Sequence, residues 1–194
     1  MRVTDPRALR ALTHPLRLDL LELLAVIGPA TAATCARHLK VSQASCSFHL
    51  RQLSKYGFVE QLSGKDRRER PWQLTSIEQS WSSVEGGAAG DELGRVFVER
   101  EADRITRWAE SNSDEPEDWR RASFLGGMTL PVDVEELNLI AEQLLEVLRP
   151  YTERLTHPES WPDDARLVRI FLSATPTAGE DAGELSTELK ERHS

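Results

Sequence analysis

The sequence predicts a mainly α-helical fold with an α+β extension at its carboxy-terminal end. Two patterns support this prediction. Within the first 75 residues, four short segments carry apolar residues at helical spacing, and a hairpin pattern follows them. From about residue 122 onward, the pattern changes to strand, helix, strand. The charges also divide between the two parts.

The formal net charge of −8 over 194 residues is an average of two unlike halves. Residues 1–75 hold twelve Lys and Arg against six Asp and Glu, a net charge of +6, and residues 76–194 carry −14. The acidic total alone argues against a nucleic-acid partner, but the basic first half does not. A stretch rich in Ser and Gly, residues 76–90, joins the halves, so we expect each half to have its own role.

Several classes of protein are disfavoured by the motifs and runs that the sequence lacks. The longest apolar run, residues 23–27, is far shorter than the roughly 18 residues that cross a bilayer. Two cysteines fit a reducing compartment, so a cytoplasmic protein is expected. No Gly-rich phosphate loop, nucleophile elbow or His-Glu-x-x-His motif occurs, and we therefore expect neither an enzyme nor a cofactor.

Start and stop signals predict four helices in the basic half. Asp5 and Ser42 have side chains that cap helix N-termini, and proline at positions 6 and 15 fits a first helical turn. Gly57 is expected to end the last helix. The predicted helices cover residues 6–12, 15–27, 32–39 and 42–56.

The helix over residues 42–56 has two distinct faces. At about 100° per residue, Cys46, Leu50 and Leu53 point to one side, where a core is expected. The other side is small, polar and basic, which suits a helix in the major groove of DNA, where Arg and Gln read base edges and Ser and Lys hold phosphates. Phe48 either touches a thymine methyl or packs on another element. The residues expected to contact DNA are Ser42, Gln43, Ala44, Ser45, Ser47, Phe48, Arg51, Gln52 and Lys55.

A β-hairpin with a basic tip is expected after this helix. Phe58 and Val59 indicate its first strand, and Trp72 and Leu74 indicate its second. The cations of the tip are expected to contact the DNA backbone or the minor groove. They are Lys65, Arg67, Arg68 and Arg70.

The basic half also carries an ordered string of short motifs. They are Asp5-Pro6-Arg7, His14-Pro15-Leu16-Arg17, Val41-Ser42-Gln43, Ser47-Phe48-His49-Leu50-Arg51-Gln52-Leu53 and Gly57-Phe58-Val59. With these motifs, residues 3–75 resemble the winged helix-turn-helix of ArsR-family transcription regulators. The resemblance implies that residues 42–56 form the recognition helix and residues 64–70 the wing. It also implies a homodimer that binds double-stranded operator DNA as a repressor and pairs through residues 5–12 and 91–109.

A metal- or thiol-responsive repressor is an alternative, because Cys35-x-x-His38 and Cys46-x-x-His49 have helical i, i+3 spacing that suits Zn²⁺. Both cysteines, however, occupy positions where the helices need small core residues, so no metal site is predicted. The metal signatures of the family are also missing: residues 32–39 contain no Cys-x-Cys, and the helix from about residue 91 contains no His. His49 is expected to pack and to form a hydrogen bond rather than to read a base.

The acidic half begins with an amphipathic helix over residues 91–109, expected either to pair two subunits or to pack within its own chain. A polar loop over residues 111–118 leads to a predicted strand over 122–130, a helix over 132–155 and a strand over 167–174. Asp133 and Glu136 form a capping box for that helix. A buried stripe is expected along it at Leu137, Ile140, Leu144, Leu148 and Tyr151.

The predicted organisation therefore has four parts: a DNA-binding domain over residues 1–75, a linker and dimerisation helix over 76–110, a strand-helix-strand dimerisation or effector domain over 111–175, and a disordered tail over 176–194. A small-molecule effector is a possible partner. Trp108, Trp119, Met128 and Trp161 could line its pocket, although such residues more often belong to a plain core. The competing function is a protein-interaction adaptor that reuses the winged helix without binding DNA.

Overall fold

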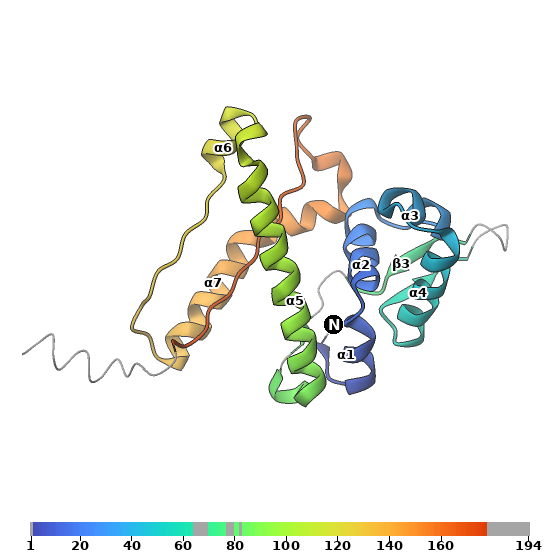
Figure 1. Cartoon of the computed structure of the whole chain (residues 1–194), viewed down its shortest axis with the longest axis horizontal. Helices are drawn as coiled ribbons and strands as arrows, with labels where there is room; N and C mark the ends of the chain where they lie inside the picture. The colour runs from blue at the N-terminus through green and yellow to red at the C-terminus, as the bar shows by residue number, and fades with distance from the viewer. Residues whose placement is uncertain (1, 64–69, 77–79, 82, 178–194) are drawn as a thin grey trace, which may run out of the picture. The chain divides into compact units, whose positions relative to one another are not determined.

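The computed structural model describes residues 2–63, 70–76, 80–81 and 83–177 (Figure 1). The chain is mainly helical with a small antiparallel sheet, as predicted. It divides into two compact units, residues 1–112 with 155–158 and residues 113–154 with 159–194. Among the helices of the described ranges, none has the length and hydropathy needed to cross a membrane.

The first unit contains the four helices predicted for the basic half. A two-residue strand, β1 (Arg2–Val3), precedes α1 (Pro6–Leu12), α2 (Pro15–Ile27), α3 (Ala32–Leu39) and α4 (Gln43–Lys55). The predicted caps are formed: the Asp5 carboxylate accepts from the Arg7 amide at 2.9 Å, and the Ser42 hydroxyl accepts from the Ser45 amide at 3.1 Å. These four helix predictions are confirmed.

The hairpin strands after α4 are also confirmed. Gly57, with φ of 75°, lets the chain turn from α4 into β2 (Val59–Gln61), which pairs antiparallel with β3 (Trp72–Leu74). Two backbone hydrogen bonds of 2.8 and 2.9 Å join Ala30 to Trp72 and tie the segment before α3 to this sheet. A further strand, β4 (Ser80–Trp81), pairs parallel with β1 and was not predicted, because two residues are too short to show an alternating pattern.

The core of the first unit is built from aliphatic side chains of α1, α2 and α4 and from the start of the hairpin. The side chains of Leu9, Leu20, Leu50 and Phe58 are fully buried there. Because α4 packs on α2 and α3, its apolar side is held inside the unit and its other side is left at the surface.

Helix α5 (Ser83–Ser111) packs against α1 and contains the predicted helix over residues 91–109. Its regular helical geometry is interrupted at Gly87, where φ is 52°. Helices α1 and α5 approach each other closely at Gly86. A Cβ built at this position would lie only 2.6 Å from Leu9 Cδ1, so the contact requires glycine or a shift of the Leu9 side chain. Leu93, further along α5, is fully buried.

A network of ion pairs joins α5 to α2. Arg100 pairs with Asp19 and with Glu22, the latter at 2.8 Å. Arg104 pairs with Glu22 and, at 3.0 Å, with Glu101, whose side chain is 1% exposed. Burial alone would raise the pKa of Glu22, but hydrogen bonds from Arg104 and Arg100 outweigh it, so the pKa lies below its usual value.

The second unit is built around one long helix. After a 3-10 turn (Asn112–Asp114), α6 (Glu117–Ala122) is followed by α7 (Val134–Glu153) and two further 3-10 turns (Arg154–Thr156 and Pro158–Ser160). The predicted capping box is formed, because the Asp133 carboxylate accepts from the Glu136 amide at 2.8 Å and the Glu136 carboxylate accepts from the Asp133 amide at 3.1 Å. The predicted helix between the two expected strands is confirmed.

The two predicted strands of this unit are wrong. Residues 123–133 and 165–177 have no regular secondary structure, and the start of the first expected strand belongs to α6. A strand needs a neighbour to satisfy its backbone N–H and C=O groups, and an alternating sequence does not provide one. The adjacent Gly126 and Gly127 further weaken strand formation in the first segment.

The stripe predicted to be buried along α7 is also wrong, because no residue of this helix is buried. Leu144 is 43% exposed and Tyr151 is 59% exposed. Met128 is 82% exposed, so it does not line an enclosed pocket with Trp119 and Trp161. The predicted tail, residues 176–194, falls almost wholly outside the described residues.

Candidate nucleic-acid interface

Helices α3 and α4 form a tight helix-turn-helix at the surface of the first unit. Thr31 caps α3, with its hydroxyl accepting from the Thr34 amide at 3.1 Å. Lys40 ends α3 in the left-handed region, with φ of 54°, and Ser42 begins the next helix two residues later. A short turn joins the two helices, which pack on each other and lie side by side in Figure 1.

One side of α4 is fully buried and the other is exposed. Cys46, Leu50 and Leu53 have 0% exposure, as the spacing predicted. On the outer side Arg51 and Lys55 are exposed, and Phe48 is 52% exposed. Because α4 packs on the core through its apolar side, its cationic side can enter a major groove of DNA while the domain stays folded.

The predicted contact residues of α4 lie at or near this surface. Gln43 and Ala44 are exposed, whereas Ser45, Ser47 and Gln52 are half-buried. The Ser42 hydroxyl oxygen is engaged as the helix cap, which leaves its O–H able to donate to a phosphate. The structure therefore presents all nine residues on one helix and its cap.

The predicted wing is described only in part. Lys65, Arg67 and Arg68 lie outside the described residues. Arg70 is exposed just before β3, and the pair of the β2–β3 ladder nearest to the wing is Gln61 opposite Trp72.

Two further cations were missed as candidate site residues. Arg37 and Lys40, in the last turn and at the C-cap of α3, are exposed and precede the N-terminus of α4. In helix-turn-helix proteins the helix before the recognition helix crosses the DNA backbone, which makes these two side chains candidates for phosphate contacts. Their position immediately before the turn was the sequence signal that could have identified them.

His49 packs inside the domain instead of facing outward. It is 9% exposed, and its ring centroid lies 4.2 Å from that of His14 and 5.1 Å from that of Phe48. Its Nδ1 has no hydrogen-bond partner among the described residues, so the packing is confirmed but the expected hydrogen bond at that atom is not seen. Burial lowers the pKa of His49, and the neighbouring His14 and Arg17 lower it further.

The two cysteines are poor ligands or redox groups in this fold. Both are free and fully buried. Burial, with a smaller contribution from Cys46, raises the pKa of Cys35 to about 11, and burial raises that of Cys46. The thiolate is the form that binds metal and reacts with oxidants, so both processes are disfavoured. Across the described ranges, no three His, Cys, Asp or Glu side chains are grouped as a metal site would require.

Comparison with known sequences identifies a helix-turn-helix domain over residues 12–61. This range covers α2, α3, α4 and β2, so the chain contains a helix-turn-helix domain built from the elements described above. No curated protein sequence matches the chain.

Solved structures with some similarity are transcription regulators or proteins of unstated role. YusO from Bacillus subtilis is 15% identical over 70% of this chain and 74% of its own, with a TM-score of 0.32. A Lactococcus lactis ZitR mutant in its apo form is 16% identical over 72% of this chain and 83% of its own, with a TM-score of 0.33. A MarR family transcription regulator is 15% identical over 77% and 79%, with a TM-score of 0.35. Scores this low leave the fold resting on the chain's own geometry.

Proposed function

We propose that the chain is a sequence-specific DNA-binding transcription regulator of the ArsR type that acts as a homodimeric repressor. The observation that carries the proposal is the division of α4 into a fully buried side and an exposed basic side. Cys46, Leu50 and Leu53 fix the helix to the core, and Arg51 and Lys55 face outward from it. Basic residues on a helix-turn-helix can neutralise the phosphates of the DNA backbone. The major groove of DNA is wide enough to admit an α-helix.

The side chains divide into base-reading and phosphate-binding groups. Arg51, Gln43 and Gln52 have the donor and acceptor groups that read base edges. Ser42 and Lys55, together with Arg37 and Lys40 of α3, would hold phosphates on either side of the groove. The wing cations Lys65, Arg67, Arg68 and Arg70 would add backbone or minor-groove contacts.

A homodimer would pair two copies through α1 and α5. These helices pack on each other within the chain, and α5 leaves Val98 54% exposed. Two recognition helices about 34 Å apart would then meet two half-sites one DNA turn apart. Binding across a promoter would repress transcription by occlusion, and the second unit would modulate that binding in response to a small molecule or a protein.

Mobility-shift titrations with DNA from upstream of the gene test the proposal. Loss of a base-reading Arg costs about 1–3 kcal/mol of binding, so Arg51→Ala should weaken specific binding roughly tenfold or more. Arg121→Ala is the matched control, because Arg121 in α6 is also exposed, pairs with Glu117 of the same helix, and lies in the other unit. Equal affinities for the wild type and Arg51→Ala would contradict the proposal.

A protein-interaction adaptor is the second candidate, favoured by the exposed apolar residues of the second unit, such as Phe124 at 87% and Met128 at 82%. Neutralising the wing cations separates the two functions. A regulator loses DNA affinity in that variant, whereas an adaptor keeps its protein partner in a pull-down and shows no salt-sensitive DNA binding to lose.

A further inference from the structure

Helix α7 carries an apolar seam that the described residues of its own unit cover only in part, with Leu137 and Ile140 half-buried. Ten of its residues are apolar, yet none of them is buried. Leu144, Val147 and Tyr151 are 43%, 67% and 59% exposed. A soluble helix with this composition normally packs on another element, because leaving so much apolar surface in water is unfavourable.

The spacing of the seam is that of a helix that pairs with another helix. Leu137, Ile140, Leu144, Val147 and Tyr151 follow one another at intervals of three, four, three and four residues. This is the a and d pattern of a two-helix coiled coil, here over two heptads. A partner helix of the same length and with the same spacing would interdigitate with it side chain by side chain.

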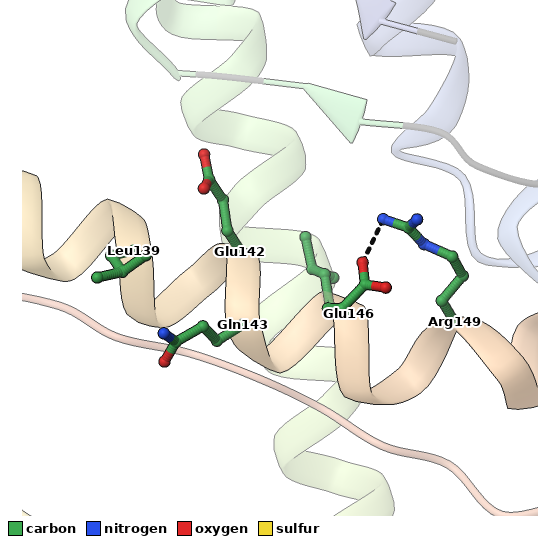
Figure 2. Close-up of a pocket in the computed structure, with 6 residues that line it drawn as sticks. Leu139, Glu142, Gln143, Glu146 and Arg149 are labelled. Atoms are coloured by element: carbon green, nitrogen blue, oxygen red, sulfur yellow. Dashed lines mark ion pairs between the residues drawn. The ribbon is translucent and has the colours of Figure 1, made fainter.

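The other side of α7 is charged and does not compete for such a partner. Figure 2 shows Glu142, Gln143, Glu146 and Arg149 around a hollow on this side, with Glu146 and Arg149 paired at 2.5 Å. One helix supplies all of the lining residues, which include three charges, and we therefore regard the hollow as part of a solvated face. Leu139 and Leu145 also line this hollow and are 53% and 63% exposed, but they alternate with the charged residues. The continuous apolar row of α7 is the seam.

On the seam side, the charges at the two ends of α7 have opposite signs, whereas Glu153, the residue before Arg154, falls on the opposite side of the helix at about 100° per residue. Asp133 and Glu136 lie at its N-terminal end, and Arg154 lies at its C-terminal end, with its guanidinium 5.0 Å from the centre of the Tyr151 ring. Two copies of α7 in parallel would set acid against acid and base against base. In an antiparallel pair centred near Leu145, Glu136 of each copy lies level with Arg154 of the other.

We infer that the seam of α7 binds the seam of a second copy of this chain in an antiparallel helix pair. A second copy satisfies the length, the spacing and the charge order of the seam at the same time. The inference deepens the proposed homodimer and rests on that proposal only for the presence of two copies.

Site-directed cross-linking of the full chain tests the pairing and its direction. At a rise of about 1.5 Å per residue, the two Leu144 positions of an antiparallel pair are offset by about 3 Å along the helices, and the two Tyr151 positions by about 18 Å. A short bismaleimide that spans the usual helix separation of about 8–10 Å reaches only the first pair. The native Cys35 and Cys46 are fully buried, so the introduced thiol is the reactive one.

Leu144→Cys should give about tenfold more covalent dimer than Tyr151→Cys at the same protein concentration, because the paired helices raise the effective concentration of the two thiols. Equal yields from both variants would indicate a parallel pair, and no dimer from either would indicate that the seam packs within its own chain or on another protein. Either result overturns the inference. Adding Arg154→Glu to Leu144→Cys should lower the yield, and an unchanged yield would overturn the charge argument.

DNA binding keeps this test separate from the proposed function. Leu144→Cys leaves α4 untouched and should bind DNA before cross-linking. A chain that binds DNA but does not cross-link overturns the inference alone, and a chain that cross-links but does not bind DNA overturns the proposed function alone.

Discussion

Helices α4 and α7 carry similar apolar patterns, but only the pattern of α4 is buried. In α4, Leu50 and Leu53 are fully buried, because α2 and α3 pack against this helix. In α7, Leu144 and Leu145 are 43% and 63% exposed, because the described part of its own unit offers no layer to cover them. The comparison shows that an amphipathic pattern specifies a helix and a face, whereas burial depends on which other elements the chain provides.

The largest effect should come from the same substitution made in each helix. Leu50→Ala should lower the free energy of unfolding by about 2–5 kcal/mol, because it removes buried methyl groups and leaves a cavity. Leu145→Ala should change it by less than about 0.5 kcal/mol, because that side chain already lies in solvent. Urea denaturation of both variants measures the difference, and similar losses would show that α7 is as well packed as α4.

A second comparison concerns ion pairs along α5. Arg104→Met leaves the 1% exposed Glu101 without that partner and should cost about 2–4 kcal/mol. Arg107→Met removes a pair with Asp103 whose two side chains are 64% and 61% exposed, and should cost less than about 1 kcal/mol. Thermal unfolding of the two variants in parallel measures this difference. If both behave alike, the contact between α5 and α2 contributes little to the first unit.

The smallest effect on the free energy of unfolding should come from lowering the pH. The pKa of His49 in the folded state lies below its unfolded value, so the unfolded chain takes up a proton first. The contribution of neutral His49 to stability is therefore fully present above its unfolded pKa of about 6.5, and it is lost as the pH falls below that value. The urea midpoint should be lower at pH 5.5 than at pH 7.5. His49→Gln should reduce that difference, and His38→Gln, at an exposed position, should leave it unchanged.

Much of the first unit could be predicted from the sequence because its signals are local. Each of these signals depends on residues only a few positions away in the chain. The structure contains the caps at Asp5 and Ser42, the stop at Gly57 and the apolar side of α4. The capping box of α7 is equally local and was also predicted. These features need no knowledge of what lies far away in the chain.

The predictions that failed depended on neighbouring elements of the structure. The strands expected over residues 122–130 and 167–174 needed neighbours that an alternating pattern does not specify. The buried stripe of α7 needed a covering layer in its unit. Within the candidate site, Arg37 and Lys40 were missed because a charged residue at a helix end is usually only solvated, and the fold places them just before α4.

The salt dependence of DNA affinity tests the central claim most directly, because it counts the phosphates that the protein neutralises. Fluorescence anisotropy titrations at several salt concentrations should give a linear fall of log affinity with log salt for the full chain. Replacing Lys55 by Ala should reduce the slope by about one, and the wing variant lacking Arg67 and Arg68 by about two. An affinity that does not change with salt, or a slope that these substitutions leave unaltered, would contradict the proposal that the basic first half, residues 1–75, binds DNA.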